Sequence, residues 1–419
     1  FSLGWRISDE TFLSGTKWLN DLKLRGSWGQ MGNQNIDPYN QYLTFRTHIW
    51  ESSYDITGSN NSVRVGYDTE RFGNPFGHWE TTTVLDIGFD ATVFNGRFSL
   101  YFDWFDRKTT DMLVQLPLPG SRGDAATPFQ NAGEMENKGI EFTFFYNNGF
   151  SNSEFQYSIG FNISHYSNKV LKLGEDQDMI IQGPSLRQRR YTRTVSGQPF
   201  MSYWGKERNG FTDGSESYWN EDGDYISDLY PNYYNYISQY GSGKGRFRFI
   251  DQNDDGVIDD DDNAFIGSPH PDFYYGLNAA FEWKGFDFTL FFQGVSGMEL
   301  INYVARWIDF TQFGGNRSIK MYEKSWTPSL GDKAELPVLS SWDNLSYQPN
   351  DYFVQTASYL RMRNMMFGYT FSNIKGVDRL RLYFQMLNLF TITKYEGLEP
   401  DLASVNQAND LSLGIDQGG

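Results

Sequence analysis

The chain has 419 residues, a length that one large domain can hold, and its formal net charge of −17 argues against a nucleic-acid partner, because phosphate binding requires a basic face. Cysteine is absent, which excludes disulfides, thiolate metal sites and thiol nucleophiles. Only 4 histidines are present, so there is little material for a histidine-based metal or acid–base centre. Aromatic residues make up 18% of the chain, yet the mean hydropathy is −0.57 and no run of about 18 apolar residues predicts a transmembrane helix.

Alternation of apolar and polar residues with a period of two, which is typical of strands, begins at the first residue. Residues 1–8 open in the middle of this pattern and contain no signal peptide, so we expect a fragment of a longer precursor. The next predicted strand is 22–28. In the strand 83–94 the apolar and polar faces separate cleanly, and Asn95-Gly96 then predicts a hairpin turn into a strand at 97–105.

Three further hairpins follow the same pattern. Their strands are predicted at 140–146 and 155–163, at 275–283 and 286–292 around Lys284-Gly285, and at 359–371 and 380–390.

The lengths of the strands and of their connections predict the fold class. The strands run to about 9–13 residues, whereas strands in globular sheets are most often about 5–6 residues long. Short turns alternate with long connections at about 30–82, 166–272 and 294–357, as short periplasmic turns alternate with long extracellular loops in outer-membrane barrels. We therefore predict an all-β chain that forms part of a transmembrane antiparallel β-barrel, with about eleven strands in 1–419.

The predicted sheet has an unpaired edge strand at each end. The strand 380–390 runs outward and no returning strand follows it, while unpaired strand edges are costly in lipid. We expect the barrel to continue beyond both ends of the chain.

One loop has the spacing of a calcium site. Residues 251–262 fit the pattern D-x-[DN]-x-[DN]-G with an acid at position 12, and Gly256 permits the sharp turn. The ligands would come from positions 1, 3, 5, 7, 9 and 12, which are Asp251, Asn253, Asp255, Val257 through its carbonyl, Asp259 and Asp262. The last position departs from the usual Glu. The ion would be structural; the alternative is a solvated acidic turn.

Aromatic residues in the long connections are the other candidate site. Tyr203, Trp204, Tyr218 and Trp219 would stack on sugar rings or pack against a partner, unless they only pack within their own loops. The basic stretch 187–190 is too short to indicate nucleic acid. No catalytic residues and no organic cofactor are predicted.

Several motifs resemble the SusC/RagA family of TonB-dependent outer-membrane transporters of the Bacteroidetes. The most specific is D-Q-N-D-D-G-V-I-D at 251–259, followed by I-G-S-P-H-P at 266–271. Similar segments lie, in the family's order, at 22–29, 131–142, 359–369 and 388–401.

The resemblance implies a 22-stranded barrel, an N-terminal plug, a TonB box and a SusD-like lipoprotein that acts as a lid. The plug and the TonB box would precede Phe1, and a closing strand would follow Gly419. Two transporters and two lids would assemble together.

These observations predict TonB-dependent import of oligosaccharides or oligopeptides across the bacterial outer membrane, in contact with lipid and with no enzymatic step. One alternative is a secreted calcium-binding β protein that binds or cleaves glycans. It accounts for the aromatic residues and the acidic loop, but for neither the strand lengths nor the alternation of turns. A passive porin is the second alternative.

Overall fold

The computed structural model divides the chain into two units. The first comprises Phe1–Thr143, Tyr166–Ile181 and Thr194–Phe200, and the second comprises Phe144–His165, Gln182–Arg193 and Met201–Gly419. The described residues are 1–13, 15–48, 50–55, 57–58, 63–115, 121, 123, 125–148, 154–174, 180–214, 218–219, 225–226, 237–238, 241–311, 313–340, 343, 345–401 and 413–418.

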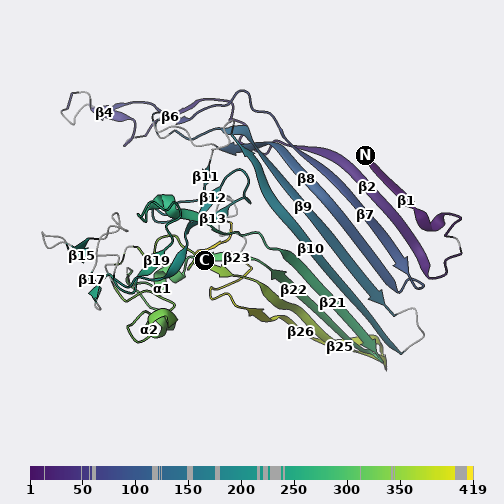
Figure 1. Ribbon diagram of the computed structural model, residues 1–419. Helices are drawn as coiled ribbons and strands as arrows, with labels where there is room; N and C mark the ends of the chain where they lie inside the picture. Colours follow the sequence, from purple (N-terminus) through teal and green to yellow (C-terminus); the bar gives the residue numbers. More distant parts are fainter. Residues whose placement is uncertain are drawn as a thin grey trace. The chain divides into compact units, whose positions relative to one another are not determined.

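Long strands dominate the described residues, and their order of hydrogen-bonded neighbours follows their order in the chain (Figure 1). The ten strands are β1 (Ser2–Arg6), β2 (Leu19–Asn33), β7 (Glu80–Val93), β8 (Phe98–Gln115), β9 (Phe129–Asn147), β10 (Phe155–Leu173), β21 (Phe273–Trp283), β22 (Phe286–Ser296), β25 (Tyr359–Ile374) and β26 (Val377–Thr393). Every pair with a described register is antiparallel, from β1–β2 to β7–β8 and from β10–β21 to β25–β26. This succession of hairpins is the up-and-down arrangement from which barrels are built.

Several strands are longer than their alternation predicts. The predicted strand 97–105 continues to Gln115, and Thr110 still pairs with Thr81 of β7. β9 begins at Phe129 instead of residue 140. Backbone hydrogen bonds hold the ladder whatever the side chains are, so polar ends of strands stay paired after the apolar pattern stops. The opposite holds at the start of the chain, where β1 ends at Arg6 and the 3-10 turn η1 (Ile7–Asp9) follows.

The tight turns lie where turn chemistry predicts them. Lys284 and Gly285 both have positive φ, 47° and 87°, and Trp283 pairs with Phe286 on either side of them. Positive φ at both central residues matches the right-handed twist of the strands, which is why Gly is favoured there. The turn at Asn95-Gly96 also has positive φ at both residues, but the strands end at Val93 and begin again at Phe98, so four residues form it.

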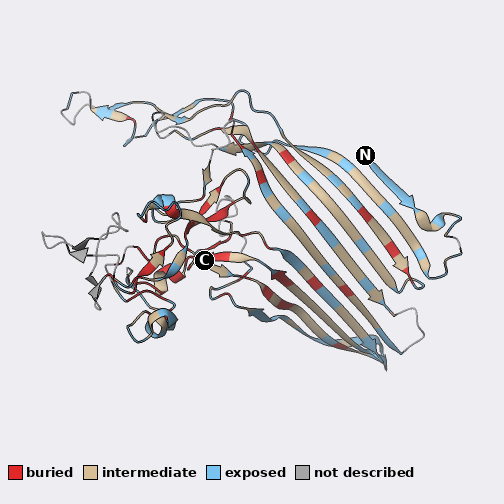
Figure 2. Cartoon of the chain, viewed as in Figure 1, coloured by how far each residue is buried: buried red, intermediate tan, exposed pale blue. Residues whose placement is uncertain are grey.

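The two faces of the long strands differ as predicted. On β7 the side chains of Leu85 and Ile87 are exposed by 38% and 52%. Figure 2 shows that exposed, intermediate and buried residues all occur along the long strands. On the opposite face Asp90 accepts from Arg25 of β2 at 2.9 Å, and the same guanidinium lies 2.9 Å from Asp103 of β8. Exposed apolar side chains on one face and ion pairs across three strands on the other are the pattern of a sheet between lipid and a polar lumen.

The long connections contain short elements. In the first unit these are β3 (Thr44–Arg46), β4 (Ser53–Asp55), β5 (Val63–Val65) and β6 (Asp68–Arg71), while β11 (Ile181–Gln182) and β12 (Thr192–Thr194) have residues in both units. The second unit has β13 (Ser202–Lys206), β14 (Arg208–Phe211), β15 (Tyr218–Trp219), β16 (Tyr225–Ile226), β17 (Ile237–Ser238), β18 (Gly241–Ser242), β19 (Phe247–Phe249), β20 (Asn263–Gly267), β23 (Glu299–Asn302), β24 (Val354–Thr356), β27 (Ile415–Asp416), α1 (Ala305–Ile308), α2 (Ile319–Lys324), η3 (Asp260–Asp262) and η4 (Gly331–Lys333). Among the described helices, none has the length and apolar character needed to cross a membrane.

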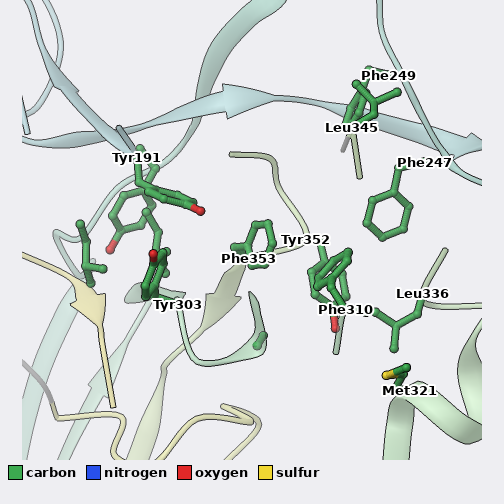
Figure 3. Packing of buried hydrophobic residues seen from close by; sticks show 14 of the residues in the cluster. Tyr191, Phe247, Phe249, Tyr303, Phe310, Met321, Leu336, Leu345, Tyr352 and Phe353 are labelled. Atoms are coloured by element: carbon green, nitrogen blue, oxygen red, sulfur yellow. The ribbon is translucent and has the colours of Figure 1, made fainter. Parts of the chain in front are cut away.

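The apolar core of the second unit is built from these connections (Figure 3). Phe353 is fully buried, and its ring centroid lies 5.3 Å from that of Tyr352, 5.6 Å from Phe310 and 6.1 Å from Tyr191. The buried members are Tyr191, Tyr203, Phe247, Phe249, Ile258, Ile301, Tyr303, Ala305, Phe310, Met321, Leu336, Leu345, Tyr352, Phe353 and Ile415. The connections of this unit therefore form a packed body with a core of its own.

Candidate functional site

The strand β13 positions the aromatic and basic residues of the candidate site. It pairs with β12 on one side, where Thr192 faces Tyr203, and with β20 on the other, where Trp204 faces Phe265. Successive side chains of a strand point to opposite faces, so neighbouring residues of β13 have different surroundings.

Tyr203 belongs to the core and not to a ligand surface, which corrects the sequence-based expectation. Its side chain is fully buried, and its hydroxyl donates to the carbonyl oxygens of Glu299 at 2.9 Å and Gly414 at 3.0 Å. Burial raises the pKa of its phenol well above the ordinary value. The ring is out of reach of any ligand, because the neighbouring strands cover it.

Trp204, the next residue, lines a cavity of about 340 Å³. Its ring meets Phe265 edge to face, with 4.9 Å between the centroids. The guanidinium carbon of Arg193 lies 4.2 Å above the centre of the Trp204 ring, within the range of a cation–π contact. The cavity is lined by Gln182, Gln188, Arg189, Arg190, Thr192, Arg193, Trp204, Lys206, Asp260, Asp261, Asn263, Gln348 and Pro349.

The other two aromatic candidates, Tyr218 and Trp219, form β15, which pairs with β16. Their side chains lie outside the described residues. A role for them in binding stays a prediction.

The first half of the acidic loop folds around its own backbone. Asp251 accepts from the N–H of Gly256 at 2.7 Å through one oxygen and from that of Asp255 at 3.3 Å through the other. Asn253 accepts from the N–H of Asp255 at 3.1 Å, and Asp255 accepts from that of Val257 at 2.8 Å. Gly256 has a φ of 84°, as the predicted sharp turn requires.

Asp262 closes the loop. Its buried carboxylate accepts from the N–H of Gln252 at 2.8 Å and from that of Asp259 at 2.7 Å. The carboxylate of Asp259 accepts in turn from the N–H of Asp261 at 2.8 Å, which completes a capping box on η3. The two ends of the loop are thus joined through one side chain.

A buried lysine stands beside this second half. The ammonium of Lys206 donates to the carbonyl oxygen of Asp259 and, at 3.3 Å, to the side-chain oxygen of Asn263, and it lies 3.9 Å from a carboxylate oxygen of Asp260. Burial lowers the pKa of Lys206, and the nearby aspartates oppose that shift. Part of the negative charge of the loop is therefore compensated by the protein itself.

The residues of the predicted calcium site all lie in this one loop, but most of their oxygens accept from backbone N–H groups. Within the described ranges, no group of three or more His, Cys, Asp or Glu side chains is arranged to hold a metal ion. A calcium ligand set also draws on carbonyl and amide oxygens, so the site stays a prediction.

The basic residues that line the cavity were not predicted from the sequence. Arg189, Arg190 and Arg193 come from the stretch around β12, and Lys206 comes from β13. The signal was present as four arginines within 187–193 of a chain with a net charge of −17. What was missing was the register that brings Lys206 and Trp204 beside them.

Comparisons with known proteins agree with this architecture. A family model described as "TonB dependent receptor-like, beta-barrel" matches residues 1–296. The chain is 30% identical to TonB-dependent receptor P3 of Formosa agariphila, over 100% of this chain and 40% of the relative. It is 29% identical to TonB-dependent receptor SusC of Bacteroides thetaiotaomicron, over 97% of this chain and 38% of that protein. The chain thus spans about 40% of the length of these curated relatives.

Solved structures show the same fold. The structure of the RagAB peptide transporter matches with a TM-score of 0.74 and 22% identity, over 99% of this chain and 41% of that one. The RagAB peptide importer in its open-open state matches with a TM-score of 0.72 and 23% identity, over 99% and 40%. The predicted barrel fold, the resemblance to SusC and RagA and the location in the outer membrane are confirmed. The chain belongs to the family of TonB dependent receptor-like β-barrel proteins.

Proposed function

We propose that the full-length protein imports oligosaccharides or oligopeptides across the bacterial outer membrane by TonB-dependent active transport. The observation that carries the proposal is the match of the TonB-dependent receptor family to residues 1–296. The exposed apolar face of β7 and the ion pairs on its opposite face support it, because a lipid-embedded barrel needs both. Transport requires no covalent chemistry, and we propose no enzymatic activity.

The packed body of the second unit supports capture of a ligand before transport. Its connections have their own aromatic core and hold a cavity of about 340 Å³, within the range of small-ligand pockets. We propose that these connections are extracellular and that a SusD-like surface lipoprotein closes over them. The similarity to SusC and to the solved structure of the RagAB peptide transporter supports this proposal.

The secreted glycan-binding alternative is less well supported. A soluble sheet buries its large apolar side chains, whereas Ile87 and Phe367 of the long strands are exposed by 52% and 46%. The passive-porin alternative differs from active transport in its energy source, so an energy-dependence experiment separates them.

The test uses the full-length protein in its native outer membrane. Uptake of a labelled oligosaccharide and oligopeptide library is measured with and without TonB, and the protein is extracted in mild detergent to identify what copurifies. Uptake that stops without TonB, together with a stoichiometric lipoprotein, is the expected result. Uptake that persists without TonB would indicate a porin, and a protein that needs no detergent would overturn the barrel proposal.

A further inference from the structure

The cavity beside Trp204 is rich in positive charge. Three guanidinium groups, from Arg189, Arg190 and Arg193, and the ammonium of Lys206 line it. The acids in the lining are Asp260 and Asp261, and the side chain of Asp260 is 93% exposed, so water screens its charge. The cavity lies entirely within the second unit.

The three arginines differ from those that pair with a carboxylate elsewhere in the chain. Arg208 pairs with Asp351 at 2.6 Å, and Arg381 pairs with Asp287 at 2.5 Å. Within the described ranges, Arg189, Arg190 and Arg193 make no ion pair with a carboxylate. Guanidinium groups that converge on a cavity without carboxylate partners form a site for an anion.

The arginines are partly held in place. Arg190 donates to the carbonyl oxygen of Gly183 at 2.6 Å, and the guanidinium carbon of Arg193 lies 4.2 Å from the centre of the Trp204 ring. The Nε atom of Arg193 is buried without a hydrogen-bond partner, and the charge of Arg189 reaches Lys206, whose pKa burial lowers and Arg189 lowers further. Asp260, Asp262 and Asp259 raise the pKa of Lys206 and so offset part of this positive charge, while the Nε atom of Arg193 still lacks a hydrogen-bond partner.

The remaining lining indicates what carries the anion. Gln182, Gln188, Asn263 and Gln348 contribute amide groups, each both donor and acceptor, as sugar hydroxyls are. The apolar part of the lining is limited to Trp204 and Pro349, which offers little to an apolar peptide side chain. The lining thus offers partners for the hydroxyls of an acidic sugar and little surface for an apolar side chain.

We propose that this cavity binds the carboxylate or sulfate group of an acidic sugar unit, so that the imported ligand is an anionic oligosaccharide. This inference rests on the transport function proposed above and names its substrate class. Arg189 and Arg193 bind the anionic group, and the amide side chains bind the hydroxyls. The positive charge of the buried Lys206 ammonium attracts the same anionic group.

The experiment measures binding to the full-length protein by calorimetry, with its copurifying partner present. The probes are a galacturonate trimer against its methyl ester, and a sulfated oligosaccharide against its desulfated form. We expect the charged member of at least one pair to bind about tenfold tighter than the neutral member. A difference within the galacturonate pair indicates a carboxylate ligand, and a difference within the sulfated pair indicates a sulfate ligand.

Variants assign the preference to the cavity. Arg189→Gln and Arg193→Gln should each remove most of the tenfold preference. Arg187→Gln is the matched control, because that guanidinium lies 4.3 Å from the Trp307 ring and does not line the cavity. Arg193→Lys retains the charge and should keep part of the preference, which separates loss of charge from loss of folding.

Two results would overturn the inference: equal or absent binding of charged and neutral members in both pairs, or a stronger preference for acidic peptides. Failure of the transport proposal looks different. If TonB-dependent uptake occurs without a preference for charge, transport stands and the cavity inference fails. If charged sugars bind but no uptake depends on TonB, the cavity inference stands and transport fails.

Discussion

Lys206 donates a hydrogen bond from its buried ammonium to the carbonyl oxygen of Asp259. One residue of β13 thereby holds the second half of the acidic loop and lines the cavity next to it. Loop order and cavity charge are therefore coupled through this one side chain, and its replacement should affect both.

Lys206→Met should loosen the acidic loop, because the carbonyl of Asp259 and the side-chain oxygen of Asn263 lose a donor. Both acceptors are only partly buried, so their loss of a donor costs at most about 1–3 kcal/mol. Hydrogen exchange at the amides of Asp261 and Asp262 should accelerate correspondingly. Lys284→Met is the control, since Lys284 is an exposed turn residue paired with Glu154 at 3.1 Å. Unchanged exchange in Lys206→Met would show that Asp262 alone closes the loop.

Glu299 should make the stability of the second unit depend on pH. Burial raises the pKa of its carboxyl and Asp272 raises it further, while the N–H of Ser268, at 3.0 Å, opposes the shift. The pKa of this carboxyl is higher in the folded than in the unfolded protein, so the folded state binds the proton more tightly. The protonated carboxyl therefore contributes its full stabilisation at pH values below its pKa in the unfolded state. That stabilisation is lost as the pH rises through its pKa in the folded state. Thermal unfolding followed across pH 4–8 should show this decline. Glu299→Gln should abolish it, whereas a decline that survives in Glu299→Gln would assign it to another group.

Local periodicity and turn chemistry predicted the long hairpins, because a strand between lipid and lumen must alternate and a two-residue turn needs positive φ. Lys284-Gly285 is the clearest case. Tyr203 and Trp204 show the limit of this reasoning. The sequence gives no reason to treat these two loop aromatics differently. Because side chains alternate along β13, Tyr203 lies in the core and Trp204 lines the cavity. Which of the two is buried depends on pairing with β12 and with β20, and β20 lies far along the chain and leaves no local signal.

Calcium should stabilise the acidic loop if the ligand pattern of 251–262 is used. Adding calcium to chelator-treated protein should then slow hydrogen exchange within the loop. The expected stabilisation is RT ln(1 + [L]/Kd), where [L] is the free calcium concentration and Kd is the dissociation constant for calcium. Asp251→Asn should weaken this response, because Asp251 occupies the first ligand position. Asp332→Asn, in η4, is a control outside the loop. If calcium leaves the exchange rates unchanged, the loop is held by its own hydrogen bonds and by Lys206.

The aromatic core should respond strongly to truncation. Phe353→Ala removes a fully buried ring that contacts Tyr191, Phe310 and Tyr352, and such a change costs about 3–5 kcal/mol. Tyr322→Ala, at an 87% exposed position of α2, should cost less than about 0.5 kcal/mol. Limited proteolysis followed by mass spectrometry should find new cuts in 301–353 for the first variant. Equal resistance of both variants would contradict a separately packed core.

The apolar face of β7 provides the sharpest test of the membrane-spanning sheet. Ile87→Arg places a charge on the exposed apolar face and should destabilise the protein in lipid by about 2–4 kcal/mol if the residue lies near the midplane. Thr92→Arg, on the opposite face of the same strand, faces the polar side and should cost much less. Reversible unfolding of the full-length protein from lipid vesicles measures both. Equal costs on the two faces would be inconsistent with lipid on one side, because only a face in contact with hydrocarbon penalises the guanidinium so strongly.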